Sequence, residues 1–137
     1  MTVKEYLEQY KTLDARINAK IEQVEHLRAM FTRAYSGGNT GGGNSGPYDK
    51  IGEITAKIVD LESEINDEID KLIDLRAEIK GYIAQIPNEK NRFVLELHYI
   101  NGYSFDKIAS LENRDRRSIL YRHEKGLKFL EKVVKIP

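Results

Sequence analysis

The arrangement of this chain depends on one stretch, SGGNTGGGNSGP at residues 36–47, which separates two long helical patterns. It holds six of the ten glycines in a sequence of 137 residues. Glycine and proline at this density do not sustain a helix or a strand, so we expect a flexible Gly-rich linker over residues 36–47. Twelve such residues span about 19 Å, whereas packed helix axes lie roughly 8–10 Å apart. The linker therefore lets the chain fold back on itself.

Apolar residues recur at steps of three and four on both sides of the linker, which is the pattern of a heptad seam. The first seam comprises Val3, Tyr6, Tyr10, Leu13, Ile17, Lys20, Val24, Leu27 and Phe31, and the second comprises Ile51, Ile54, Ile58, Leu61, Ile65, Glu68, Leu72, Leu75, Ile79, Tyr82 and Ile86. The sequence thus predicts an all-α protein that begins with a long antiparallel coiled-coil hairpin over residues 1–86. Its helices are expected at about 2–35 and 48–86.

The second helix carries more apolar residues than one partner helix would cover. Val59, Ile69, Ile73 and Ile83 lie next to its seam and widen the apolar stripe. Such a stripe favours burial against further helices. We therefore expect a homo-oligomer, or a partner protein, held through the hairpin.

Each seam has one charged interruption, Lys20 in the first helix and Glu68 in the second. The two side chains could pair inside the hairpin, which requires a shift of about one helical turn from a symmetric fold-back. The interpretation favoured from the sequence is different. It places Ile21 and Ile69 in the seam and both charges at its edge.

Proline and three capping residues mark a separate C-terminal module over residues 87–137. Pro87 disfavours helix at the residue before it, and Asn88, Ser104 and Asp115 are N-cap residue types placed before helical patterns. The predicted layout is helix, turn, short helix, turn, long helix, as in a helix-turn-helix motif. Ile108, Ala109 and Ile119 should pack the two motif helices together, and Asn113 falls where the turn commonly needs a positive φ.

Charge is distributed unevenly although the whole chain is neutral, with 22 basic and 22 acidic residues. Residues 1–35, 48–86 and 87–137 carry net charges of +1, −5 and +4. With Ile119, His123 and Leu127 turned inward, basic and aromatic side chains face outward on the last helix. The candidate DNA-binding residues are Arg114, Arg116, Arg117, Leu120, Tyr121, Lys125 and Lys128. The arginines suit guanine edges or phosphates, and the lysines suit the backbone.

Residues 87–130 resemble region 4 of sigma-70-type factors, most closely over FVLELHYINGYSFDKIA at residues 93–109. The whole chain resembles a family of small proteins from prophages and mobile elements of Firmicutes that are described as sigma-like transcriptional regulators. The resemblance implies a tail that reads promoter DNA, and it leaves a contact with RNA polymerase open. It also implies that Ser104 caps the first motif helix, and that Arg116, Arg117, Leu120 and Tyr121 face the groove.

The chain departs from this family at three positions of the motif. An apolar residue is usual near positions 112, 114 and 122, where this sequence has Glu112, Arg114 and Arg122. Nothing in the chain resembles the segment of a sigma factor that melts promoter DNA. A complete sigma factor is therefore not expected.

No pattern of catalytic or metal-binding residues is present. His26, His98 and His123 stand alone on different predicted helices, and there is no cysteine. The histidines of the last module are expected to pack in or beside its core. The Gly-rich linker lacks the ending of a phosphate-binding loop. We expect no enzyme, no metal and no cofactor.

The sequence predicts a cytoplasmic, DNA-binding transcription regulator with double-stranded DNA as its partner and no membrane association. It lacks the apolar segment of a signal peptide and a membrane span. Two alternatives stay open. One is a coiled-coil adaptor that docks on RNA polymerase or another protein without binding DNA, and the other is a recognition subunit for phage DNA packaging.

Overall fold

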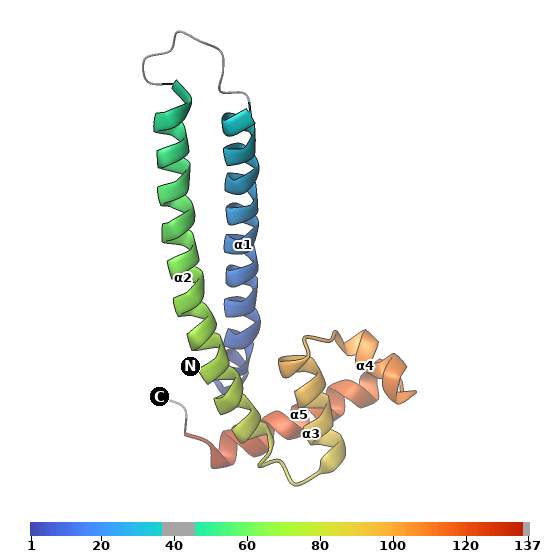
Figure 1. Cartoon of the computed structure of the whole chain (residues 1–137). Coiled ribbons are helices and arrows are strands. Elements are labelled where there is room, and N and C mark those ends of the chain that lie inside the picture. Colours follow the sequence, from blue (N-terminus) through green and yellow to red (C-terminus); the bar gives the residue numbers. More distant parts are fainter. Residues whose placement is uncertain (37–45, 136–137) are drawn as a thin grey trace. The chain divides into compact units, whose positions relative to one another are not determined.

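A computed structural model describes residues 1–36 and 46–135, and every element in these ranges is a helix (Figure 1). The two long helices are α1 (Val3–Ser36) and α2 (Gly46–Ile83). They are followed by α3 (Glu89–Leu95), a π-helical turn η1 (Glu96–Ile100), α4 (Phe105–Glu112) and α5 (Arg116–Val133). The expected all-α class is confirmed.

The boundaries of the long helices differ slightly from those expected. Helix α2 begins at Gly46 rather than at residue 48, because proline at residue 47 is tolerated in the first turn of a helix. It ends at Ile83 rather than at residue 86, where Pro87 restricts the preceding backbone. Residues 37–45 of the expected linker lie outside the described residues. The others, Ser36, Gly46 and Pro47, belong to helices.

Residues 14–71 form one compact unit, in which parts of α1 and α2 lie side by side. The ammonium group of Lys20 is 2.8 Å from Glu68 Oε1 and 3.3 Å from Glu64 Oε2, and Arg28 pairs with Glu62. The residue later in α1, Arg28, pairs with the residue earlier in α2, so the two segments run in opposite directions. Every seam position in the unit is buried or half-buried, with Ile17 and Ile65 among the most enclosed.

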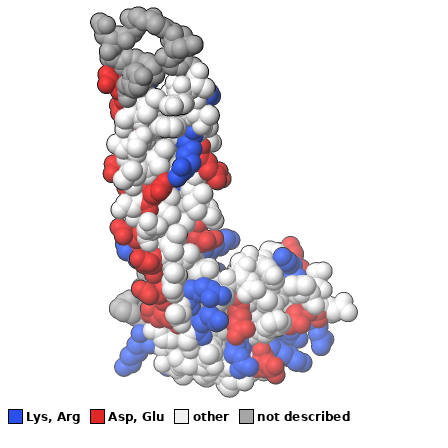
Figure 2. All heavy atoms as spheres, in the orientation of Figure 1, with Lys and Arg blue, Asp and Glu red and all other residues white. Residues whose placement is uncertain are grey.

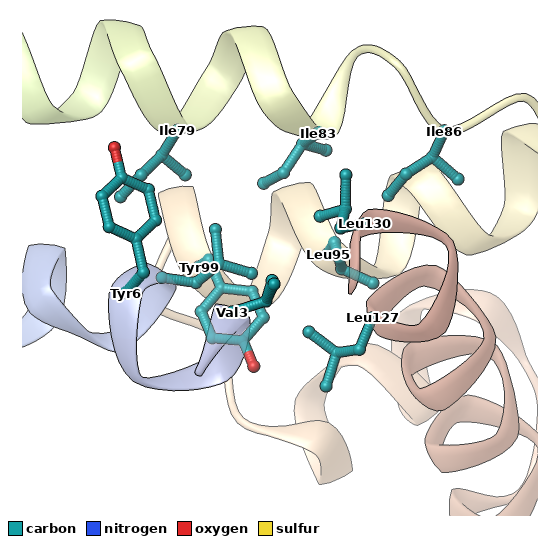
Figure 3. Packing of buried hydrophobic residues seen from close by; sticks show 10 residues of the cluster. Val3, Tyr6, Ile79, Ile83, Ile86, Leu95, Tyr99, Leu127 and Leu130 are labelled. Carbon is teal, nitrogen blue, oxygen red and sulfur yellow. The ribbon is translucent and has the colours of Figure 1, made fainter. Parts of the chain in front are cut away.

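The second compact unit joins residues 1–13 to residues from 72 onward. Its core is formed by the first turns of α1, the last turns of α2 with Ile86 beyond its end, α3, η1 and α5 (Figure 3). The buried members of this core are Val3, Tyr6, Leu7, Ile79, Ile83, Ile86, Leu95, Tyr99, Leu127 and Leu130. Packing thus groups the chain differently from the sequence division at residue 86. The heptad seam continues into this core, since Val3, Tyr6, Ile79 and Ile86 are seam positions.

A smaller core lies between α4, α5 and the segment of α3 and η1. It consists of Val94, Leu97, Ile108, Ala109 and Ile119, all of them buried. Ile108 and Ile119 are fully enclosed, which confirms the expected packing of the two helices. This core fixes the orientation of α5 relative to α4.

Candidate nucleic-acid interface

Three N-caps define the helices of the C-terminal module, as the sequence predicts. Asn88 Oδ1 accepts from the Asn91 amide at 3.0 Å, and Ser104 Oγ accepts from the Lys107 amide at 3.1 Å. Asp115 Oδ1 accepts from the Ser118 amide at 2.8 Å. These bonds satisfy amides that have no partner within the helix. The bonds from Ser118 hold the pKa of the Asp115 carboxyl below its usual range.

The turn between α4 and α5 is set by one residue in the left-handed region. Asn113 has φ 56° and ψ 42°, and its amide donates back to Ser110 O at 3.3 Å. Glycine adopts this conformation most readily, and asparagine tolerates it better than most residues that carry a side chain. The predicted positive φ at Asn113 is therefore confirmed.

Helix α5 approaches α3 closely at Gly126. A Cβ atom built there would lie 2.5 Å from Leu95 Cδ1 and 3.3 Å from Leu95 Cδ2. Leu95 is itself fully buried, so it has little room to move. Glycine at this position allows the core to hold α5 close to α3, with the opposite face of α5 toward solvent.

All seven candidate DNA-binding residues are exposed. They are Arg114, Arg116, Arg117, Leu120, Tyr121, Lys125 and Lys128. Leu120 and Tyr121 are large apolar residues that are 38% and 63% exposed. Figure 2 shows basic and acidic side chains together on the visible face of the C-terminal helices. The candidates therefore form an accessible surface of mixed chemistry in which five of the seven residues are basic.

Two of the candidates have neighbours that the sequence did not indicate. Arg116 Nε is 3.7 Å from Asp106 Oδ1 of α4, and both side chains are largely exposed. Lys125 Nζ lies 5.3 Å from the centre of the Tyr121 ring. Exposed pairs of this kind contribute little to stability, so both cations stay available to a ligand.

A hollow of about 450 Å³ adjoins the first two turns of α5. It is lined by Asn88, Lys90, Asn91, Arg117, Ser118, Tyr121 and Arg122. The structure thus brings Arg117 and Tyr121 together with residues at the start of α3, whereas the other five candidates do not line the hollow. Lys90, Asn91 and Ser118 are not among the residues that the sequence pattern indicated. Only the count of basic residues per segment could have drawn attention to Lys90.

Arg122 and Glu112, two departures from the sigma-like pattern, are neighbours. Arg122 Nη1 is 3.8 Å from Glu112 Oε1, and their side chains are 14% and 28% exposed. An ion pair thus stands at the positions where the resemblance leads one to expect apolar packing. The distance exceeds that of a hydrogen bond, so the pairing is loose.

Two histidines, His98 of η1 and His123 of α5, form part of a cluster of aromatic rings. His123 is buried, and its Nε2 lies 2.7 Å from Tyr99 Oη. His98 donates from Nδ1 to Tyr103 O at 2.8 Å and stacks on Phe105 with ring centres 4.1 Å apart. The prediction that both histidines pack in or beside the core is confirmed.

Burial changes the titration of these side chains. It lowers the pKa of His123 to about 4, with smaller contributions from the charges of His98 and Lys4. It also lowers the pKa of His98 and raises that of Tyr99. A neutral His123 therefore supports the inner face of α5 at neutral pH.

Within residues 1–36 and 46–135, no group of three His, Asp or Glu side chains is arranged to hold a metal ion. None of the helices described is long and apolar enough to cross a membrane. The resemblance to sigma factors and to the prophage family stays a prediction. No protein-family model, curated protein or solved structure matches this chain.

Proposed function

We propose that this protein is a DNA-binding transcription regulator of the phage or mobile-element type. In this proposal, residues 87–137 form a sigma-70 region 4-like helix-turn-helix module that reads double-stranded promoter DNA. Helices α1 and α2 form an antiparallel coiled-coil hairpin for oligomerisation or for binding a partner.

The exposed face of α5 is the observation that carries this proposal. Ile119, His123 and Leu127 are buried on its inner face, and Arg117, Tyr121 and Lys125 are exposed on its outer face. A recognition helix needs this division, because one face must be held by the module while the other enters the major groove. The left-handed turn at Asn113 and the short preceding helix α4 have the layout that supports such a helix.

Selection of bound duplexes from random DNA with the full chain tests this proposal. We expect enrichment of a common sequence. Arg116→Ala should relax the preference at one base position if Arg116 is bidentate to guanine, which corresponds to about 1–3 kcal/mol. Lys128→Ala should weaken binding to all sequences evenly, because phosphate contacts carry no sequence information. Recovery of the input pool without enrichment would contradict the proposal.

The exposed apolar residues of α2 support self-association. Val59, Ile69 and Ile73 are 60%, 36% and 61% exposed. At 100° per residue, they lie within about 80° of one another around the helix axis. Sedimentation of the full chain should give a mass of at least two copies, and Val59→Lys should lower it. A monomer at all concentrations would remove oligomerisation from the proposal.

An adaptor that docks on protein is the second candidate, because Phe93 on α3 and Leu111 on α4 are 43% and 60% exposed. Large apolar residues at a surface favour a protein contact. Copurification after nuclease treatment separates the two candidates. An association with RNA polymerase that survives nuclease, together with a purified chain that ignores DNA, would favour the adaptor.

A further inference from the structure

We infer that the hollow beside the start of α5 is a binding site for one phosphate of a nucleic-acid backbone, held by Lys90, Arg117 and Arg122. This inference rests on the proposed DNA-binding function and adds a contact from α3 that lies outside the motif helices.

The charge of the hollow indicates an anionic ligand. Its lining contains three cations, Lys90, Arg117 and Arg122, and no carboxylate. Asn88, Asn91, Ser118 and Tyr121 add amide and hydroxyl groups that donate hydrogen bonds. Cations combined with neutral donors are the set that proteins use for phosphate oxygens.

A neighbouring hollow shows that this charge is specific to one place. It is lined by Glu89, Lys90, Arg92, Phe93, Glu96 and Glu112, and so contains three carboxylates. Lys90 borders both hollows, but only the one beside α5 lacks acidic residues. The inference therefore applies to the α5 side of Lys90.

Arg122 supplies an independent observation. Its side chain is only 14% exposed, and the carboxylate paired with it is 3.8 Å away. Within the described residues, its guanidinium makes no hydrogen bond. Its N–H donors are therefore available to a ligand, and a phosphate supplies several acceptor oxygens at once.

The position of the hollow suits the DNA backbone. Arg117 belongs to the first turn of α5, where a recognition helix enters the groove, and Lys90 and Asn91 belong to the first turn of α3. A phosphate between them would fix the angle of α5 on the duplex, since backbone contacts set orientation. Lys90 then positions the helix without reading a base.

The test combines Lys90→Ala with single neutral methylphosphonate substitutions along a duplex selected by the full chain. We expect Lys90→Ala to weaken binding on the order of three- to tenfold on every sequence and to lower the salt slope by about 0.9. At one backbone position, the methylphosphonate should weaken the wild type more than it weakens the Lys90→Ala variant, which keeps only Arg117 and Arg122 at that phosphate. Lys80→Ala, an exposed lysine of α2 that lines neither hollow, is the charge-matched control and should behave as the wild type.

The outcomes separate this inference from the proposed function. If the wild type binds the duplex but Lys90→Ala has the same affinity, salt slope and methylphosphonate pattern, the phosphate site is wrong and DNA binding stands. If the wild type binds no DNA, both fail. If Lys80→Ala weakens binding as much as Lys90→Ala, the effect is general charge and the site is again wrong.

Discussion

Lys20 Nζ donates to Glu68 Oε1 at 2.8 Å, so the single charged interruption of one heptad seam is paired with that of the other. The hydrogen bond to Glu68 raises the pKa of Lys20. Ile21 and Ile69, which were expected to take over the seam, are 38% and 36% exposed. The interpretation favoured from the sequence was therefore wrong. The paired charges fix the register of the two segments instead, as buried polar residues do in coiled coils.

Removing one charge of this pair should destabilise the protein more than removing both charges. Lys20→Leu leaves the largely buried Glu68 carboxylate without its ammonium partner, and Glu68→Leu leaves the Lys20 ammonium without that carboxylate. Each single variant should have a melting temperature a few degrees below that of the wild type. The double variant should be at least as stable as the wild type. Thermal unfolding followed by circular dichroism measures this. A double variant less stable than both single variants would show that the pair stabilises the fold outright.

The close approach of α5 to α3 predicts different effects of alanine at two glycines. Gly126→Ala places a methyl group against Leu95, whereas Gly52→Ala meets nothing within 4 Å. The second change should stabilise the protein by about 0.5–1 kcal/mol, because alanine favours helix. Gly126→Ala should be less favourable than Gly52→Ala by about 1–3 kcal/mol, because the added methyl group overpacks the core. Urea denaturation gives both values, and equal effects at the two sites would contradict the close packing.

The left-handed turn at Asn113 predicts which substitutions it accepts. Asn113→Gly should leave the free energy of unfolding unchanged within about 0.5 kcal/mol, since glycine adopts φ 56° freely. Asn113→Ala should cost about 1–2 kcal/mol. The comparison uses the same urea denaturation. An alanine variant as stable as the glycine variant would mean that the turn between α4 and α5 has another conformation.

Stability should fall as the pH is lowered below 6.5. The pKa of His123 is about 4 in the folded protein against an ordinary 6.5, so below pH 6.5 the unfolded chain binds a proton that the folded chain does not. Well above pH 6.5, His123 is neutral in both the folded and the unfolded chain, so its protonation takes nothing from the stability there. Between pH 7 and pH 5 the loss should be about 2 kcal/mol.

Urea denaturation across this pH range, with two variants, assigns the effect to His123. His123→Gln should lose most of the pH dependence, although it also loses the bond to Tyr99. His26→Gln, at an exposed position of α1, should keep the pH dependence. If the two variants respond to pH in the same way, burial of His123 in the aromatic cluster is not the cause of the pH dependence.

The helices and their caps could be predicted because their causes are local. A Ser, Asn or Asp before a helical pattern caps the next turn whatever lies elsewhere, and Ser104, Asn88 and Asp115 do so. The seam positions follow from the 3.6-residue period alone. The left-handed conformation of Asn113 likewise depends on residue type and place.

Contacts between distant residues could not be predicted in the same way. The register that joins Lys20 to Glu68 depends on how α1 and α2 pack, and the shared core of Val3 and Leu130 depends on the tertiary fold. The hollow that contains Lys90 exists only because the start of α3 lies beside the first turns of α5. Sequence pattern reports which face of a helix is apolar, and it does not report which neighbour covers that face.

Whether the exposed face of α5 binds DNA is decided by the salt dependence of binding by the full chain. The measurement is fluorescence anisotropy of a selected duplex at several salt concentrations, with Lys125→Ala/Lys128→Ala compared with the control Lys50→Ala/Lys71→Ala on α2. All four lysines are exposed, so neither double variant should unfold the chain. If the α5 lysines contact phosphates, the α5 variant should lower the slope of log affinity against log salt by about 1.8, and the control should leave the slope unchanged. Identical slopes for the two variants, or no binding by the wild type, would contradict DNA binding by this face.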